Sequence, residues 1–341
     1  MQAVIINDEK EADWDEFVET NPDVISWHKY DWYKVLKRAH NIPYYPIAVY
    51  DGSKICGILP LYEISTFRTG KILMSIPYVV AGGIVAPEEE VRQLLLKKAV
   101  ELSTELQAPL TLKQYRTKVN GDFLVDDSYF NLEKTLSPNS DEIWEDISEE
   151  NRRKIEEASS LGLTMEYPAS DFNSFYKLLS AHQQSLGIPC QSKSWVKYLV
   201  DTNMYKMALL KLGGVIVAAS MAKTFKDTVS FPMSCYDPKD QKGELYMYEL
   251  YWKLMKQLGS EGIRISHSGR IPDSKGVPAF RLGWGGKANR YYYQYYGAGE
   301  KTSTESSSKR GRKREIFVNV WSKLPMPIIN LLGPVIIKQL P

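Results

Sequence analysis

The sequence is short of cysteine and of net charge, and each shortage excludes a class of protein. Its three cysteines, Cys56, Cys190 and Cys235, stand far apart and form no CxxC pair, so we expect neither a disulfide framework nor a metal site. Lys and Arg number 43 against 41 Asp and Glu, which gives a formal charge of +2. Such a balance creates no global field for DNA, so we expect no DNA partner.

Long apolar runs are also missing. No uncharged apolar stretch is long enough to span a bilayer, and the first ten residues carry Asp8, Glu9 and Lys10 where a signal peptide would have an apolar core. We therefore expect a cytoplasmic location. The composition, with 43% apolar and 25% charged residues, is that of a folded protein, and 341 residues suggest two domains.

The first half of the chain contains a hairpin followed by a strand and a helix. Two apolar runs flank Asp51-Gly52, a pair typical of a β-hairpin turn, and residues 72–85 read as a further extended stretch. Three glutamates after Pro87 open a helix with one apolar face. Residues 109–115 follow as a strand.

The second half repeats this order. Gly213-Gly214 separates two apolar runs, residues 228–236 read as a third strand, a helix opens at Glu244, and residues 263–267 form the next strand. The hairpin turn precedes the helix by about 30 to 36 residues in both halves, close to one supersecondary repeat. We predict an α/β (α+β) fold with a duplicated unit; the alternative is that two generic α/β segments share this order.

The expected division of the chain follows from this repeat. Residues 1–136 would form an N-terminal domain and residues 137–300 a C-terminal domain. Residues 301–341 would form a basic linker and an apolar tail interrupted by proline.

Several short motifs, taken together, resemble a known family. They are Trp27 with Tyr30–Trp32, Gly57–Leu61, Ser75–Tyr78 with Gly82-Gly83, Asn151–Ile155, Ser185–Pro189, and Ser268–Arg270 with Phe280–Gly285. Their order and spacing resemble the FemAB-like proteins, which are related to the FemA, FemB and FemX peptidyltransferases. The subgroup associated with exosortase and exopolysaccharide loci looks most similar, and the resemblance covers roughly residues 5–296 plus the proline-rich tail.

The resemblance implies both a fold and an activity. It implies two tandem GNAT-like domains, each a mixed sheet flanked by helices. It implies an acyltransferase or aminoacyltransferase that acts on an amine of a cell-envelope or polysaccharide-type precursor, either a small molecule or lipid-linked. The acyl donor would be aminoacyl-tRNA or acyl-CoA, and no cofactor is firmly implied. The alternative is a non-catalytic scaffold of polymer assembly that keeps the duplicated fold.

The sequence departs from the family pattern in three places. It has no long charged helical hairpin of the kind associated with tRNA, which weakens the tRNA interpretation. The loop 237–243 lacks the glycine-rich pattern that holds a CoA pyrophosphate. Arg281 stands where lysine is usual, and arginine keeps its charge at ordinary pH, so a role in proton exchange is in doubt there.

The strongest candidate site residues follow the strand 263–267. Arg270 comes just after the strand and would bind a phosphate or carboxylate, with an ion pair to Asp273 as the alternative. Arg281 would stabilise developing negative charge, or be an exposed strand charge. His267 is a candidate base, although a structural histidine is the simpler interpretation. Ser268 is a candidate substrate contact beside it.

Other candidates lie elsewhere in the sequence. Arg152 and Arg153 form a basic corner of a helix, or a solvated face paired with nearby glutamates. A glycine-containing extended segment in the first half offers backbone amides to a substrate, or forms a bulge. Its candidates, with one from the strand that follows, are Ser75, Tyr78, Gly82, Gly83 and Gln114.

The tail combines a basic cluster with an apolar, tryptophan-containing segment. The cluster comprises Lys309, Arg310, Arg312, Lys313 and Arg314. Basic residues beside such a segment suit the surface of an anionic membrane, and the prolines exclude one continuous spanning helix. Peripheral contact with the inner membrane face and packing on the chain's own C-terminal domain remain alternatives.

Overall fold

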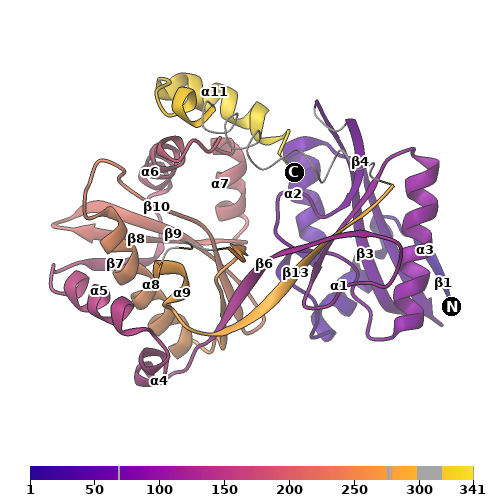
Figure 1. The fold of residues 1–341 in the computed structure, drawn as a ribbon, viewed down its shortest axis with the longest axis horizontal. Helices are drawn as coiled ribbons and strands as arrows, with labels where there is room; N and C mark the ends of the chain where they lie inside the picture. The colour runs from indigo at the N-terminus through magenta and orange to yellow at the C-terminus, as the bar shows by residue number, and fades with distance from the viewer. Residues whose placement is uncertain (68–69, 275–276, 278, 298–316, 341) are drawn as a thin grey trace. The chain divides into compact units, whose positions relative to one another are not determined.

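The structure is a computed structural model that describes residues 1–67, 70–274, 277, 279–297 and 317–340. These residues form two compact units (Figure 1). Of the described residues, 1–129, 290–297 and 338–340 belong to unit 1, and 130–289 and 317–337 belong to unit 2. The basic cluster predicted between residues 309 and 314 lies outside the described residues.

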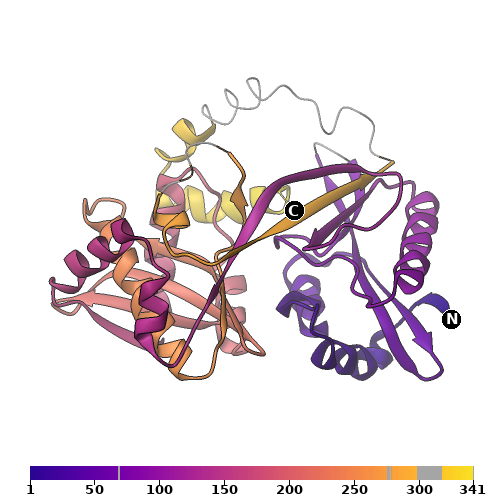
Figure 2. The same cartoon turned by 60° about the horizontal axis from the view of Figure 1, so that its bottom comes forward.

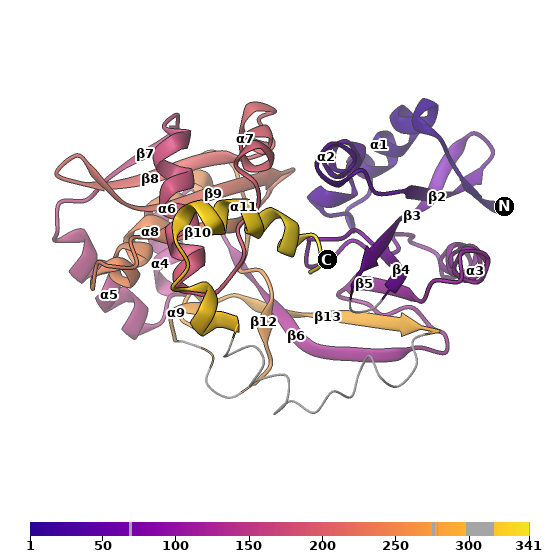
Figure 3. The same ribbon diagram turned by 90° about the horizontal axis from the view of Figure 1, so that it is seen from above.

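Unit 1 is a mixed sheet with helices on both faces. Its sheet has the order β1-β2-β3-β4-β5-β13, and α3 lies on the face opposite α1 and α2 (Figure 3). The apolar face of α3 packs on β2, β3 and β5 to form the core. In chain order the elements are β1 (Gln2–Ile5), the 3₁₀ turn η1 (Asp8–Lys10), α1 (Glu11–Thr20), η2 (Ser26–His28), α2 (Tyr30–His40), β2 (Tyr44–Asp51), β3 (Lys54–Thr66), β4 (Gly70–Ser75), α3 (Glu89–Glu105) and β5 (Leu110–Tyr115).

Unit 2 has the same construction. Its sheet has the order β6-β11-β10-β9-β8-β7, with α6 on one face and α8 on the other (Figure 1). The elements are β6 (Leu124–Thr135, shared with unit 1), α4 (Ser140–Glu145), α5 (Glu149–Ser159), β7 (Thr164–Ala169), α6 (Phe172–Ser185), α7 (Lys193–Asp201), β8 (Lys206–Leu212), β9 (Val215–Phe225), β10 (Thr228–Tyr236), α8 (Gly243–Ser260), β11 (Ile265–His267), β12 (Ile271–Pro272), α9 (Ala279–Leu282), β13 (Lys287–Tyr296, shared with unit 1) and α11 (Met326–Ile337).

The duplication predicted from the sequence is confirmed. In unit 1 the run β2-β3-β4-α3-β5 is antiparallel until β4 pairs in parallel with β5. In unit 2 the run β8-β9-β10-α8-β11 is antiparallel until β10 pairs in parallel with β11. A strand and two helices precede each run, and the leading strand pairs with the first strand of the run. The chain is therefore an α/β protein built from one unit used twice.

Local sequence signals explain most of these elements. The hairpin turns fall on Gly52 and on Gly213-Gly214, all with positive φ. The hydroxyl of Ser148 accepts a hydrogen bond from the Asn151 amide, which caps α5. Glutamates at the start of α3 suit the positive end of the helix dipole.

The final strand of each sheet comes from the other half of the sequence. In unit 1, β13 pairs antiparallel with β5 and sets Tyr291 opposite Tyr115. In unit 2, β6 pairs antiparallel with β11 and sets His267 opposite Glu133. These two long strands are also neighbours of each other (Figure 2). Each unit therefore needs residues from both halves of the chain.

Two local expectations are wrong. The extended stretch expected over residues 72–85 ends at Ser75, where β4 stops, and Tyr78 turns the backbone with a φ of 63°. Arg281 lies on the short helix α9 and not on a strand. Phe280 and Trp284, on either side of Arg281, pack with Tyr248 and Tyr251 of α8, and this packing favours a compact turn over an extended segment.

Candidate functional site

The parallel strands β10 and β11 of unit 2 separate part of the way along their length. They pair only from Thr228 to Ser230, opposite Ile265 to His267, whereas β10 continues to Tyr236. The register of β10 against β9 also shifts between Ser230 and Met233. Side chains and backbone groups at the ends of separating parallel strands become accessible, so this region is the candidate site of unit 2.

The chain leaves β11 and turns onto β6. The Ser268 amide donates to the Leu132 carbonyl over 3.0 Å, and the Ser268 hydroxyl accepts from the Leu132 amide over 2.8 Å. The Gly269 amide donates to Asn131 Oδ1 over 3.0 Å. These bonds hold the residues after His267 against β6 and away from β10.

Asn131 orients His267. Asn131 is fully buried on β6, and its Nδ2 lies 2.9 Å from His267 Nδ1. The Gly269 amide can only donate, so the atom that it contacts must be the side-chain oxygen of Asn131. Asn131 Nδ2 then donates to His267 Nδ1, and the neutral ring carries its proton on Nε2. We therefore assign His267 as a hydrogen-bond donor through Nε2, an arrangement that does not suit proton abstraction by the neutral ring.

Arg281 fixes the backbone that follows His267. Its guanidinium donates to the carbonyl of Arg270 over 3.0 Å and to that of Ser268 over 3.4 Å. The side chain of Arg270 is exposed. The structure thus brings together four of the predicted residues, His267, Ser268, Arg270 and Arg281, at the end of one strand.

A chain of hydroxyl groups lies on the β10 side of this region. Tyr251 of α8 donates to Ser234 over 2.8 Å, and Ser234 lies 2.8 Å from Ser220 of β9. Burial raises the pKa of Tyr251, while the Ser234 hydrogen bond and the charge of Arg281 act in the opposite direction. The net shift is upward, so Tyr251 keeps its proton at neutral pH and remains a donor.

The two arginines of α5 stand close to α9. The Asn151 side chain donates to the Phe280 carbonyl over 3.4 Å, and α5 packs on α9. Arg152 is half-buried and Arg153 is exposed. Their role in substrate binding stays a prediction.

In unit 1 the equivalent region, where β4 and β5 stop pairing, is filled by residues of unit 1 itself. Strands β4 and β5 pair only at Leu73 and Met74, and beyond that point the Ser75 hydroxyl accepts the Lys113 amide over 2.8 Å. The Gly82 amide donates to the Lys113 carbonyl over 3.0 Å. Ser75 and Gly82 are buried and serve the fold, and their predicted contact with substrate stays a prediction.

The remaining candidates of unit 1 surround this closure. Gly83 lies against the side chain of Gln114, where any added Cβ would come within 2.5 Å of the amide oxygen. Gln114 is buried, and its Nε2 has no hydrogen-bond partner among the described residues. The Tyr78 hydroxyl donates to the Lys338 carbonyl over 3.2 Å. The tail thus reaches Tyr78 and not Gln114.

In the loop before α8, backbone amides donate hydrogen bonds to acceptors of the loop itself. The Lys242 amide donates to Asp240 Oδ1 over 2.9 Å, and the Gly243 amide donates to the Asp240 carbonyl over 3.0 Å. The Lys239 amide donates to Asp237 Oδ1 over 3.0 Å. A pyrophosphate would have to displace two carboxylates that repel it. The residues at this helix start therefore do not fit a CoA pyrophosphate.

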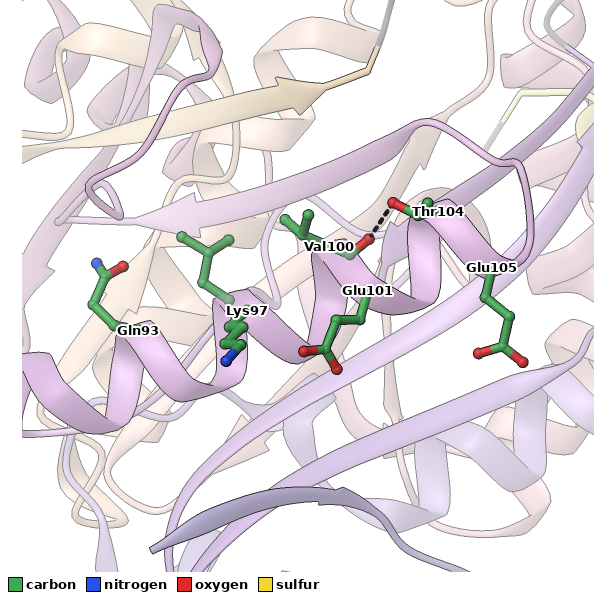
Figure 4. A pocket seen from close by; sticks show the side chains of 7 residues that line it. Gln93, Lys97, Val100, Glu101, Thr104 and Glu105 are labelled. Atoms are coloured by element: carbon green, nitrogen blue, oxygen red, sulfur yellow. Dashed lines mark hydrogen bonds between the residues drawn. The ribbon is translucent and has the colours of Figure 1, made fainter.

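One surface hollow of the described residues lies on α3 and carries no comparable chemistry. It measures about 670 Å³ and runs along the outer face of α3. Its labelled side chains all come from this single helix, and Thr104 bonds back to the Val100 carbonyl over 3.0 Å (Figure 4). Within the described residues, no group of three or more His, Cys, Asp or Glu side chains is placed to hold a metal ion.

Sequence reasoning missed Asn131, Tyr251 and Ser234. Asn131 lies on β6, a strand that the sequence pattern did not predict because its alternation of apolar residues is weak. Tyr251 reads as one of several aromatics on α8, and Ser234 as one small residue of a strand. Their only signal is three-dimensional proximity.

Comparison with known proteins identifies the fold. No protein-family model matches the sequence, and no curated protein matches it. Among solved structures, FemX superposes with a TM-score of 0.65 over 87% of this chain and 97% of its own, at 13% identity. The chain has the fold of FemX. At this identity the likeness establishes the FemAB-like tandem GNAT fold, as expected from the motifs, and nothing about substrates.

Two further structures support this fold assignment. L-PGS from Bacillus licheniformis matches with a TM-score of 0.58 over 94% of this chain and 99% of its own, at 12% identity. A tandem GNAT protein from the clavulanic acid biosynthesis pathway matches with a TM-score of 0.54 over 88% and 99%, at 9% identity. The FemX-like fold therefore extends across most of the chain.

Proposed function

We propose that the protein is an N-acyltransferase or aminoacyltransferase. It would transfer an activated acyl group to an amine of a cell-envelope or polysaccharide-type precursor, small or lipid-linked. The observation that carries this proposal is the separation of β10 from β11 beside an oriented donor, His267 Nε2, and the guanidinium of Arg281. The FemX fold and its likeness to L-PGS support the same class of reaction.

The chemistry requires an oxyanion site and a path for one proton. The amine nitrogen attacks the carbonyl carbon of the donor, so that a C–N bond forms and negative charge develops on the carbonyl oxygen. His267 Nε2–H supplies a neutral donor toward that charge, and the guanidinium of Arg281 adds a positive field. The C–O or C–S bond to the leaving group then breaks, and the leaving group takes the proton lost by the amine.

We propose aminoacyl-tRNA as the donor in preference to acyl-CoA. Asp237 and Asp240 occupy the amides that a CoA pyrophosphate would need at the start of α8. An aminoacyl ester places its reactive carbonyl at the end of a nucleic acid and does not require that loop. Unit 2 would be the catalytic unit, because unit 1 fills its equivalent region with Ser75 and Gly82.

Ligand-dependent stabilisation tests this proposal directly. A ligand at 100 times its Kd stabilises the native state by about 2.7 kcal/mol, which is measurable as a rise in Tm. We expect a rise with a non-hydrolysable aminoacyl-tRNA analogue or with an amine-bearing sugar-nucleotide precursor, and none with acetyl-CoA. Stabilisation by acetyl-CoA alone would reverse the choice of donor.

A transfer assay separates an enzyme from a scaffold. Labelled aminoacyl-tRNA is incubated with amine-bearing precursors, and the new amide is detected by mass. Binding of the precursor without any amide product would favour the alternative, a non-catalytic protein of polymer assembly.

A further inference from the structure

The tail helix α11 is apolar around its whole circumference. Between Met326 and Ile337 its only hydrogen-bonding side chain is that of Asn330. A helix of this composition is normally buried on all sides. In this protein only part of it is buried.

One stripe of α11 packs on unit 2. Ile329 is fully buried, and Gly333 lies so close to the Cys190 backbone that an added Cβ would come within 2.9 Å of the Cys190 oxygen. α11 packs on α6, which lies beside it in Figure 3. Just before the helix, Gln184 of α6 donates to the Leu324 carbonyl over 2.6 Å. The helix is thus held along one side.

The other stripe faces outward. Ile328, Leu331, Leu332 and Val335 are 40%, 72%, 41% and 57% exposed. Their spacing of i, i+3, i+4 and i+7 places them on one face of the helix. Four large aliphatic side chains on one exposed face form an apolar patch of the kind that marks an interaction surface. We call this set the outer stripe.

The charged residues of the described tail segment have one sign. Residues 317–340 contain Lys323 and Lys338, which flank α11, and no Asp or Glu. In the sequence, the basic cluster of residues 309–314 lies a few positions upstream, although the stripe itself is built from described residues alone. The surface that complements this stripe is therefore apolar in its interior and negatively charged at its edge.

The length of the helix defines how it would bind such a surface. Twelve residues rise about 18 Å, well short of the roughly 30 Å of a bilayer core. None of the described helices is long and apolar enough to cross a membrane. A short helix held to the protein by one stripe and exposing the other would lie flat in a membrane interface.

We infer that the outer stripe of α11 docks on the surface of an anionic lipid bilayer. Leu331 and Val335 enter the boundary between headgroups and acyl chains, and Lys323 and Lys338 contact anionic headgroups. A second copy of the chain suits the stripe less well, because a twofold contact would bring the lysines of both copies together. This inference does not depend on the proposed transferase activity.

Sedimentation with sucrose-loaded vesicles tests the inference on the full chain. Wild-type protein should sediment with phosphatidylglycerol–phosphatidylethanolamine vesicles, bind phosphatidylcholine vesicles much less, and be released by high salt. The double substitution Leu331→Glu with Val335→Glu should lower the partition coefficient at least about tenfold.

The matched control lies in the hairpin between β8 and β9. Leu212 and Val215 are 36% and 67% exposed and belong to the same unit. Leu212→Glu with Val215→Glu makes the same chemical change away from the tail and should leave vesicle binding within about twofold of wild type. Circular dichroism confirms that both double variants are folded.

Three results would overturn the inference. The first is a wild type that does not bind the anionic vesicles or that binds neutral vesicles equally well. The second is a tail variant that binds as tightly as the control variant. The third is a wild-type dimer, seen by sedimentation velocity without lipid, that only the tail variant disrupts while vesicle binding is unchanged; this result would assign the stripe to a second copy.

Discussion

Asn131 Nδ2 lies 2.9 Å from Nδ1 of His267, and Asn131 Oδ1 accepts the Gly269 amide. A buried amide side chain on β6 therefore determines both the tautomer of the histidine and the path of the backbone behind it. The donor character that we assign to His267 depends on this one amide.

Asn131→Asp should reverse the tautomer. A carboxylate has no N–H to donate, so the oxygen that replaces Nδ2 would accept a hydrogen bond from His267 Nδ1–H, while the other oxygen still accepts one from the Gly269 amide. Nitrogen-15 chemical shifts of the imidazole measure the proton position directly. We expect Nε2–H in wild type and Nδ1–H in the variant. Asn139→Asp, at the start of α4, is the control and should leave His267 unchanged.

Arg281→Ala should lower turnover far more than stability. Its guanidinium bonds two carbonyls at the end of β11, and loss of such bonds on a half-exposed side chain costs only about 1–2 kcal/mol. Loss of the positive field and of the fixed loop should reduce kcat of the proposed transfer by about 10²-fold or more.

Arg264→Ala is the matched control for Arg281. Arg264 also donates from its guanidinium to a backbone carbonyl, that of Gly259, over 3.4 Å, and it precedes β11 where Arg281 follows it. We expect Arg264→Ala to leave kcat within about twofold, since it lies at the paired end of β11, opposite the end where β10 and β11 separate. Equal losses of Tm and activity in Arg281→Ala would make that residue structural.

The repeat could be predicted because short stretches of sequence contain the signals for each of its elements. Glycine turns, acidic helix starts and apolar stripes mark β2 to β5 and β8 to β11 within short windows. The assignment of β13 to unit 1 has no such signal. Its partner β5 lies more than 170 positions earlier. A division of the chain into contiguous residue ranges therefore places these two paired strands in different domains.

The candidate site was predictable to the same extent. His267, Ser268, Arg270 and Arg281 follow one predicted strand, so their proximity could be inferred from the chain itself. Asn131 reaches His267 from a strand 136 residues away, and Tyr251 and Ser234 meet through the packing of α8 on β10. Tertiary contacts of this kind produce no periodic pattern of residues in the sequence.

Acid should destabilise unit 1 through His28. Burial lowers the pKa of His28 to about 4, while its ring bonds the Gly83 carbonyl and the Ile25 amide. In the unfolded chain the histidine binds a proton below about pH 6.5. Between about pH 4 and pH 6.5 the unfolded state therefore binds more protons than the folded state. Stability is complete above about pH 6.5 and falls as the pH drops toward 4, by about 3 kcal/mol in total.

His28→Gln should remove the contribution of His28 to the pH dependence of the unfolding free energy. Hydrogen exchange of unit 1 amides at pH 7 and pH 5 measures it, and the wild type should lose about 2 kcal/mol over this interval through His28. His40, whose pKa burial also lowers to about 4, remains in both proteins and supplies a common background. An unchanged pH dependence in the variant would contradict the assignment.

Ser75→Ala tests whether the closure in unit 1 is structural. The substitution leaves the buried Lys113 amide without its acceptor, which should cost about 1–3 kcal/mol of unfolding free energy. Ser65→Ala, at an exposed position of β3, should cost less than about 0.5 kcal/mol. Chemical denaturation measures both. If Ser75→Ala instead weakens precursor binding at unchanged stability, its predicted role as a substrate contact would be supported.

Gly333→Val should detach α11 from unit 2. Any side chain at this position meets the backbone of Cys190, which cannot move as a flexible side chain can, so the helix must shift outward at a cost of about 1–3 kcal/mol. Ile329, fully buried in the wild type, would then become exposed. Asn330→Val is the control, because it places the same β-branched residue at an exposed position of the same helix. Hydrogen exchange of α11 should accelerate in Gly333→Val alone; equal acceleration in both variants would mean that helix propensity, and not the contact with Cys190, holds the tail in place.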